Sequence, residues 1–272
     1  MTTAVREENL VVDGLNIRLL EQGEGRPLLL LHGGTIGFSA DMWRRNMAAF
    51  AKAGFRTIAY DQPGYGESDD PSDFALAYRQ SFIARLLDAL DVAAAAWVGH
   101  SQAGGLAVGA ALDDAARCER LVVLGTGSLL PPLPGAVAGK EAAPEESAPD
   151  IEATRALLEA NLYDHAQITP ALLADYHRRC IGRHFTNAAK RGQAGGSAGR
   201  GGAPLWQRLG ALAMPALFLY GRNDRGKPAE RVALAQQRFP ALAFHLLDKC
   251  HHIVQWDRAD EFQRLTLDFL RS

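Results

Sequence analysis

Long apolar runs, paired cysteines and a surplus of either charge are all missing from this 272-residue sequence. No apolar run approaches the ~20 residues that a transmembrane helix needs, and the first ten residues are too polar for a secretory signal. The net charge of -2 lacks the basic excess of a nucleic-acid-binding protein, and no basic stripe restores it. We therefore expect a cytoplasmic protein that binds neither a membrane nor nucleic acid.

The motifs of metal and cofactor sites are missing as well. The cysteines, Cys118, Cys180 and Cys250, are far apart and form no CxxC pair, which argues against a disulfide framework and a zinc knuckle. The histidines form no HExxH motif, and neither a GxGxxG nor a P-loop pattern occurs. We expect mostly reduced cysteines, no bound metal and no cofactor.

What the sequence contains is an alternation of short apolar runs and amphipathic stretches. Residues 10–21 place apolar side chains on both sides of the turn dipeptide Asp13-Gly14 and predict an antiparallel hairpin at a sheet edge. Buried strands are expected at 28–31, 55–60, 95–99, 121–124, 216–220 and 243–247, and helices at 42–52, 78–90, 102–112, 151–160, 170–181, 228–238 and 257–270. This alternation predicts an α/β protein with a mostly parallel, doubly wound sheet.

The alternation is interrupted over residues 129–204, where prolines are frequent at first and two of the predicted helices follow. Residues 192–202 contain six glycines, whose backbone is costly in entropy to order. We predict a single domain over residues 1–272 with an inserted helical lid at 129–204. Within it, the glycine-rich segment 192–202 forms a mobile lid edge or a surface linker.

One serine lies between a predicted strand and a predicted helix. Ser101 stands in Gly99-His100-Ser101-Gln102-Ala103, where small neighbours let a sharp turn close and force the serine side chain outward. The N–H groups at the start of the following helix can stabilise negative charge that develops during a reaction. Ser101 is therefore our candidate nucleophile, although Ala103 replaces the final glycine of G-x-S-x-G and such a serine can also be only a helix N-cap.

A nucleophilic serine needs a base and a carboxylate that orients the base, and in this type of fold they follow in the order serine, acid, histidine. Asp224 comes directly after the predicted strand at 216–220, and His252 follows the strand at 243–247. Both side chains would meet at the carboxyl edge of the sheet. A simple turn aspartate and a role for the neighbouring His251 are the alternatives.

The turn at residues 32–35, His-Gly-Gly-Thr, follows another buried strand. It would bring the Gly34 N–H beside Ser101, so that the N–H groups of Gly34 and Gln102 form an oxyanion hole. The turn can also be only a tight loop. Ser101, Asp224, His252 and this turn nevertheless each follow a predicted strand, and together they favour a complete hydrolytic site.

The motifs HGGT, DQPGYGES, GHSQAGG and GRNDR, followed by a late histidine, occur in the order found in α/β-hydrolases, and the chain resembles that family over nearly its whole length. It is most similar to the meta-cleavage product hydrolases, serine enzymes that cut a carbon–carbon bond in vinylogous 1,5-diketones formed by aromatic ring opening. Residues 157–173 and 250–270 carry this closer resemblance, which favours His252 over His251 as the base. The resemblance also suggests a homodimer.

Three positions depart from that subfamily. His100 stands where an asparagine is usual, Ile253 where a tryptophan follows the base, and Tyr176 where a lid arginine meets the substrate carboxylate. The resemblance implies that these positions bind substrate. Arg178 and Arg179 lie close enough to Tyr176 on the same helix to replace the arginine, although they can also form a solvated basic helix end.

The sequence thus predicts a serine hydrolase that acts on a small molecule and, by resemblance, cleaves a carbon–carbon bond. An esterase or lactonase on the same scaffold is the main alternative, because the three departures weaken dienoate recognition. A ligand-binding receptor that keeps the fold without turnover is a further alternative, against which the complete triad argues. Dehalogenase or epoxide chemistry in its usual form would need an aspartate in place of Ser101.

Overall fold

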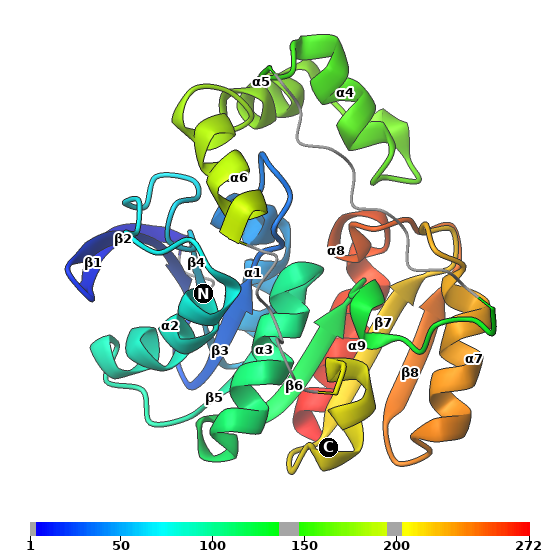
Figure 1. Ribbon diagram of the computed structural model, residues 1–272. Coiled ribbons are helices and arrows are strands. Elements are labelled where there is room, and N and C mark those ends of the chain that lie inside the picture. Colours follow the sequence, from blue (N-terminus) through cyan, green and yellow to red (C-terminus); the bar gives the residue numbers. More distant parts are fainter. Residues whose placement is uncertain (1–3, 136–146, 195–202) are drawn as a thin grey trace.

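The computed structural model describes residues 4–135, 147–194 and 203–272 of the chain. Its centre is an eight-stranded sheet in the order β1-β2-β4-β3-β5-β6-β7-β8, with helices on both faces (Figure 1). The strands are β1 (Arg6–Val12), β2 (Leu15–Gln22), β3 (Arg26–Leu31), β4 (Phe55–Tyr60), β5 (Ala95–His100), β6 (Cys118–Leu124), β7 (Ala216–Gly221) and β8 (Ala243–Leu247). The six strands from β4 to β8 in this order run parallel, which confirms the predicted α/β architecture.

Strands β1 and β2 form the antiparallel hairpin expected at the sheet edge. Val12 pairs with Leu15, and between them Asp13 and Gly14 adopt positive φ angles of 55° and 78°. Positive φ at both central residues is the geometry that a two-residue hairpin turn requires. The turn dipeptide therefore places the hairpin where the sequence predicts it.

The helices connect these strands. They are α1 (Arg44–Lys52), α2 (Leu76–Ala89), α3 (Gln102–Asp113), α4 (Ile151–Glu159), α5 (Pro170–Arg178), α6 (Arg183–Ala194), α7 (Pro228–Arg238), α8 (Val254–Asp257) and α9 (Ala259–Arg271). Short 3-10 segments are η1 (Ala40–Trp43), η2 (Ala115–Arg117), η3 (Gly127–Leu129), η4 (His165–Gln167) and η6 (Leu205–Ala211).

Two apolar cores form because successive side chains of a strand point to opposite faces. In β3, Leu29 and Leu31 belong to the core that contains residues of α2, α3 and α7. Leu28 and Leu30 belong to the other core, which contains residues of α1 and α9. All four leucines are fully buried, as expected for a parallel strand that is covered on both faces.

Two helical regions differ from the sequence prediction. The helix expected at 257–270 is divided into α8 and α9, because Arg258 between them has a non-helical backbone (φ -130°, ψ 48°). Helix α6 is not predicted at all, since its buried residues, Asn187 and Arg191, are polar and leave no apolar periodicity. Arg191 Nη1 donates to the Gly64 carbonyl at 3.0 Å, so polar contacts hold this helix on the core.

Helices α4, α5 and α6 come between β6 and β7 in the sequence and stand above the carboxyl edge of the sheet (Figure 1). An apolar cluster connects α4, α5 and the segments beside them to the core; its buried members are Phe38, Met42, Leu158, Leu162, Ile168, Leu173, Tyr176, Cys180, Ile253 and Trp256. Most of the predicted glycine-rich segment 192–202 lies outside the described residues, as does part of 129–204. The boundaries of the lid therefore stay a prediction.

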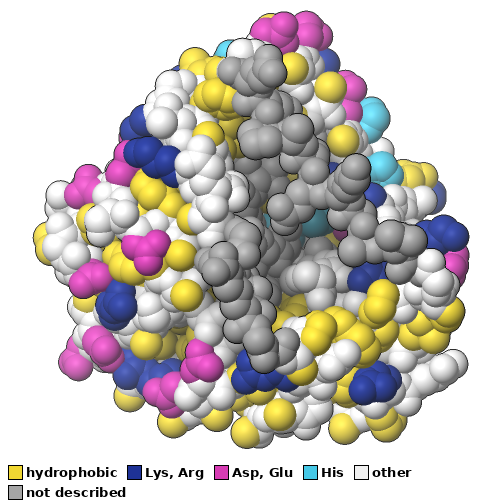
Figure 2. All heavy atoms as spheres, viewed as in Figure 1, with side chains coloured by type: hydrophobic (Ala, Val, Ile, Leu, Met, Phe, Trp, Pro, Cys, Tyr) yellow, Lys and Arg dark blue, Asp and Glu magenta, His cyan; other side chains and the backbone are white. Residues whose placement is uncertain are grey.

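In the described ranges, no helix combines the length and the apolar character that crossing a membrane requires. Charged side chains of both signs are scattered over the face shown in Figure 2.

Arg18 in β2 is buried, and its guanidinium contacts the carboxylates of Glu7 at 2.7 Å, Asp41 at 3.0 Å and Asp61 at 3.2 Å. This cluster ties β2 to the edge strand β1, to η1 and to the loop after β4.

We expect Arg18→Met to lower the free energy of unfolding by about 3–5 kcal/mol, because it leaves the fully buried carboxylate of Asp61 without its counterion. Arg26→Met is the matched control, because Arg26 and Glu119 form an exposed pair whose loss costs about 0–1 kcal/mol. Urea unfolding followed by tryptophan fluorescence measures both variants. Equal stabilities would contradict the role given to Arg18.

Candidate active site

A sharp turn joins β5 to α3 at Ser101. Ser101 has φ 55° and ψ -125°, a backbone conformation that is strained for a residue with a side chain. The turn closes because its neighbours are small: a Cβ on Gly99 would lie 2.8 Å from the Gly104 Cα, and a Cβ on Gly104 would lie 2.1 Å from Thr126 Oγ1. The Ser101 hydroxyl makes no capping bond to α3, in contrast to the N-cap alternative.

The Ser101 hydroxyl instead donates to His252 Nε2, with 2.8 Å between Oγ and Nε2. On the other side of the ring, His252 Nδ1 donates to Asp224 Oδ2 at 2.9 Å. The side chains of His252 and Asp224 are 7% and 9% exposed, so water screens this chain of hydrogen bonds only weakly. The ring of His251 lies elsewhere, edge-on to Tyr163. The structure thus brings together Ser101, His252 and Asp224.

The turn at residues 32–35 lies beside the serine. A Cβ on Gly33 would come 3.0 Å from Ser101 Cβ, and a Cβ on Gly34 would come 2.2 Å from Gln102 Oε1. In the parts of the chain that are described, the N–H groups of Gly34 and Gln102 have no hydrogen-bond acceptor. Two N–H groups next to the serine can therefore receive an anionic oxygen.

His32 fixes the shape of this turn. Its Nδ1 donates to the Gly33 carbonyl at 2.8 Å, and its Nε2 accepts from the Gln62 N–H at 3.0 Å. Complete burial lowers the pKa of His32 to about 3, so the ring is neutral and can accept at Nε2. The turn is held by specific hydrogen bonds and is more than a tight loop.

Of the predicted substrate-binding residues, His100 and Ile253 support the loop of His252. His100 Nε2 donates to the His252 carbonyl at 2.9 Å, and burial holds the pKa of His100 well below its usual value. Ile253 is fully buried in the apolar cluster between lid and core. Both residues are adjacent to the catalytic candidates, and their contact with substrate stays a prediction.

Tyr176 in α5 packs against residues 36–38, which follow the turn at 32–35. Its hydroxyl donates to the Ile36 carbonyl at 2.8 Å, and its ring packs edge-on against Phe38. Phe38 in turn packs against His100. The ring of Phe38 therefore lies between Tyr176 and His100, and the Tyr176 hydroxyl already has a backbone partner.

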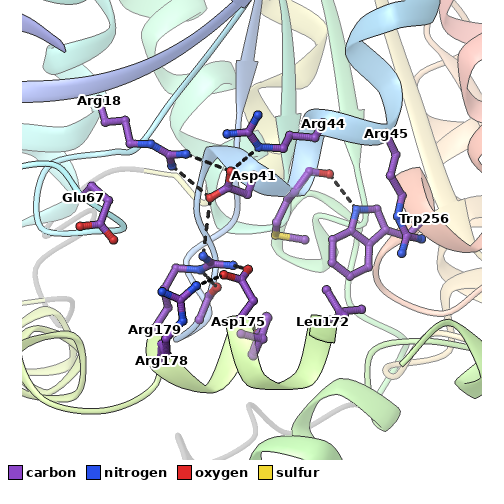
Figure 3. A pocket seen from close by; sticks show the side chains of 13 residues that line it. Arg18, Asp41, Arg44, Arg45, Glu67, Leu172, Asp175, Arg178, Arg179 and Trp256 are labelled. Atoms are coloured by element: carbon purple, nitrogen blue, oxygen red, sulfur yellow. Dashed lines mark hydrogen bonds and ion pairs between the residues drawn. The ribbon is translucent and has the colours of Figure 1, made fainter. Parts of the chain in front are cut away.

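Arg178 and Arg179 line a different cavity of about 460 Å³, whose lining includes none of the triad residues (Figure 3). Both guanidiniums bind the carboxylate of Asp175, and Arg179 also lies 3.6 Å from Asp41. Tyr176 lines this cavity too, and Arg179, three positions later, shares its face of the helix. The structure does not bring these arginines to the triad.

Asn161, in the loop after α4, is a site residue that the sequence analysis missed. Its carbonyl accepts from the N–H groups of both His252 and Ile253 at 3.1 Å, and its Oδ1 accepts from Arg225 Nη2 at 3.2 Å. One lid residue therefore contacts the loop of the base and the loop of the acid. No motif or periodicity marks it, because it acts mainly through its backbone.

No three histidine, cysteine or carboxylate side chains in the described ranges come together in a way that could hold a metal ion. The three cysteines are buried, and no disulfide joins them. Burial raises the pKa of the Cys118 and Cys250 thiols, which keeps them protonated. The chemistry that these residues offer is that of a serine, a histidine and a carboxylate.

A model of the alpha/beta hydrolase fold matches residues 26–259. A 2-hydroxy-6-oxononadienedioate/2-hydroxy-6-oxononatrienedioate hydrolase from Burkholderia vietnamiensis is 32% identical over 97% of this chain and 94% of its own length. A 2-hydroxy-6-oxo-6-phenylhexa-2,4-dienoate hydrolase from Comamonas testosteroni is 32% identical over 93% and 90%. The structure of a meta-cleavage product hydrolase from Pseudomonas fluorescens shares the fold with a TM-score of 0.78, at 24% identity over 97% of both chains.

We expect His252→Ala to lower kcat by ~10⁴-fold or more on any substrate that the protein turns over, because the serine loses its base. His251→Ala is the matched control, since the neighbouring ring makes no contact with Ser101 or Asp224, and its kcat is expected within about threefold of native. Steady-state kinetics of the two variants distinguishes the histidines. A larger loss in His251→Ala would contradict the assignment.

His32 and His100, which are fully buried, also make stability depend on pH. Their folded pKa values lie below the ordinary value near 6.5, so the unfolded chain binds more protons as the pH falls below 6.5. The free energy of unfolding should therefore decrease from pH 6.5 to pH 5, by roughly 1.5 kcal/mol for His32 and in the same direction for His100. In urea unfolding, His100→Asn should remove one such contribution, and His245→Asn, at an exposed position, should not. An unchanged decrease in His100→Asn would contradict a neutral His100.

Proposed function

The chain belongs to the alpha/beta hydrolase fold family, and from this premise we propose that it is a serine hydrolase that cleaves a carbon–carbon bond in a vinylogous 1,5-diketone. The observation that carries the proposal is the hydrogen-bonded series Ser101, His252 and Asp224 beside two unused N–H groups. The names of the relatives add the substrate class, since both act on 2-hydroxy-6-oxo dienoates or their homologues. The cytoplasmic location and the homodimer expected from the sequence stay predictions.

In the proposed mechanism, His252 Nε2 takes the proton of the Ser101 hydroxyl as Oγ attacks the substrate ketone. Asp224 stabilises the imidazolium that forms, and the N–H groups of Gly34 and Gln102 bind the oxyanion. His252 then returns the proton to the leaving group as the bond to the carbonyl carbon breaks. Water, activated by the same histidine, releases the acid from Ser101.

A carbanion is a poor leaving group, so cleavage of a carbon–carbon bond needs one further step. The 2-hydroxy dienoate must first change from its enol to its keto form, which moves one proton from oxygen to carbon. The broken bond then leaves its electron pair on a carbon that the new carbonyl group stabilises. His252 is hydrogen-bonded to Ser101 and is the titratable group that we assign to this proton transfer.

Ester or lactone hydrolysis is the second candidate, and a specific observation favours it. Tyr176 stands where the resemblance places a substrate-binding arginine, and its hydroxyl is engaged with the Ile36 carbonyl. Arg178 and Arg179 are ion-paired with Asp175 and do not approach the triad. A substrate without a carboxylate would suit this arrangement equally well.

The assay that separates these reactions compares the native protein with Ser101→Ala on ring-cleavage products and on aryl esters or lactones. We expect the native protein to remove the yellow dienolate absorbance, and Ser101→Ala to do so ~10⁴-fold more slowly because the nucleophile is gone. Turnover of esters or lactones alone would assign the second candidate. Equal rates for both proteins would contradict serine catalysis altogether.

A further inference from the structure

Arg79 is a buried arginine without a carboxylate partner among the described residues. It lies in the first turn of α2 and is 3% exposed. Its hydrogen-bond partners are neutral oxygen atoms of Gln62, Tyr65 and Gln102, and its Nε has no partner in the described ranges. Burying an unpaired charge is costly, so such an arginine calls for an explanation in the chemistry beside it.

The two arms of this guanidinium reach both sides of the proposed oxyanion hole. Arg79 Nη2 donates to Gln102 Oε1 at 2.7 Å, and Gln102 supplies one of the two N–H groups. Arg79 Nη1 donates to the Tyr65 hydroxyl at 3.2 Å, and that hydroxyl donates to the Gly34 carbonyl at 3.1 Å. One side chain is thus connected to the residues of both N–H groups.

Packing between the two sides makes their spacing depend on the Gln102 side chain. The Gln102 amide lies directly against the Gly34 Cα, where a Cβ would come 2.2 Å from Oε1. Arg79 sets the position of this amide, because the bond from Arg79 Nη2 is the one hydrogen bond that Gln102 Oε1 accepts in the described ranges. Moving the guanidinium would therefore shift the contact that separates Gly34 from Gln102.

The charge of Arg79 also acts on this turn. After burial, which is the main cause, the Arg79 charge further lowers the pKa of His32, two residues before Gly34. A field that disfavours positive charge on His32 favours negative charge nearby. No described carboxylate pairs with the guanidinium, so its field at the developing oxyanion is not cancelled by a close counterion.

We propose that Arg79 is a positioning residue of the oxyanion hole, which holds the N–H groups of Gly34 and Gln102 in place and favours negative charge between them. This inference rests on the proposed function, because it presupposes that Ser101 attacks an electrophile at this point. It does not depend on which bond the enzyme cleaves. Phosphonylation of the serine uses the same hole and can therefore test it without the natural substrate.

The test measures the rate at which a fluorophosphonate ester labels Ser101, followed by intact mass, in native protein, Arg79→Met, Tyr65→Phe and Arg85→Met. We expect the rate constant to fall about 10- to 100-fold in Arg79→Met and less in Tyr65→Phe, because the first loses both connections and the second loses one. Arg85 lies on the same helix and pairs with Asp13, so Arg85→Met should label at the native rate.

Two further readouts separate positioning from a loss of folded protein. The fraction of Arg79→Met labelled after long incubation should equal that of native, and with an aryl ester kcat should fall while KM changes less than about threefold. Arg79→Lys keeps the charge but lacks the two-armed fork and should recover only part of the rate. If only part of the Arg79→Met protein is ever labelled, and that fraction matches the fall in rate, Arg79 has a structural role instead.

Each outcome decides a different claim. If Ser101 is labelled in the native protein and at the same rate in Arg79→Met, the inference is overturned and the proposed function stays intact. Absence of labelling in the native protein, or labelling at a residue other than Ser101, would overturn the proposed function and this inference with it. If Arg79→Met does not fold, Tyr65→Phe decides, and a native rate in that variant contradicts the connection to Gly34.

Discussion

The strained backbone of Ser101 is the constraint on which the rest of the site depends. Its positive φ at the end of β5 presents the hydroxyl above the sheet edge, and small neighbours on both sides permit the turn. Parallel strands end at the same edge, so the loops after β7 and β8 deliver Asp224 and His252 to the same place. The fold thus converts sequence positions that are far apart into hydrogen-bond distances.

Hydrogen bonds to the backbone of His252 hold the proposed base in place. The His252 N–H donates to the carbonyl of Asn161 in the lid, and the His252 carbonyl accepts from His100 in the core. Burial keeps His100 neutral, which preserves this bond without placing a second positive charge beside the base. The loop after α4 and strand β5 therefore both hold the backbone of His252 in place.

Much of this arrangement can be predicted from the sequence, because local patterns encode it. Apolar runs mark the buried strands, and glycines and strand ends mark the loops that carry Ser101, Asp224 and His252. Helix α6 cannot be predicted in this way. It has no apolar stripe, and polar contacts of Asn187 and Arg191 hold it on the core.

The same limit applies to residues whose partners are distant in the sequence. Arg79 looks like any helical arginine until the fold places it against Gln102, and Asn161 acts through a carbonyl that every residue possesses. Arg178 and Arg179 illustrate the reverse case, because their closeness to Tyr176 along the chain brings them to Asp175 and not to the triad.

The most direct measurement of the central claim is a crystal structure of the protein with a boronic acid, which forms a tetrahedral adduct with a nucleophilic serine. The account predicts boron on Ser101 Oγ and one boronate oxygen ~2.7–3.1 Å from the N–H nitrogens of both Gly34 and Gln102. Boron on another residue, or an adduct whose oxygens avoid these two N–H groups, would contradict it.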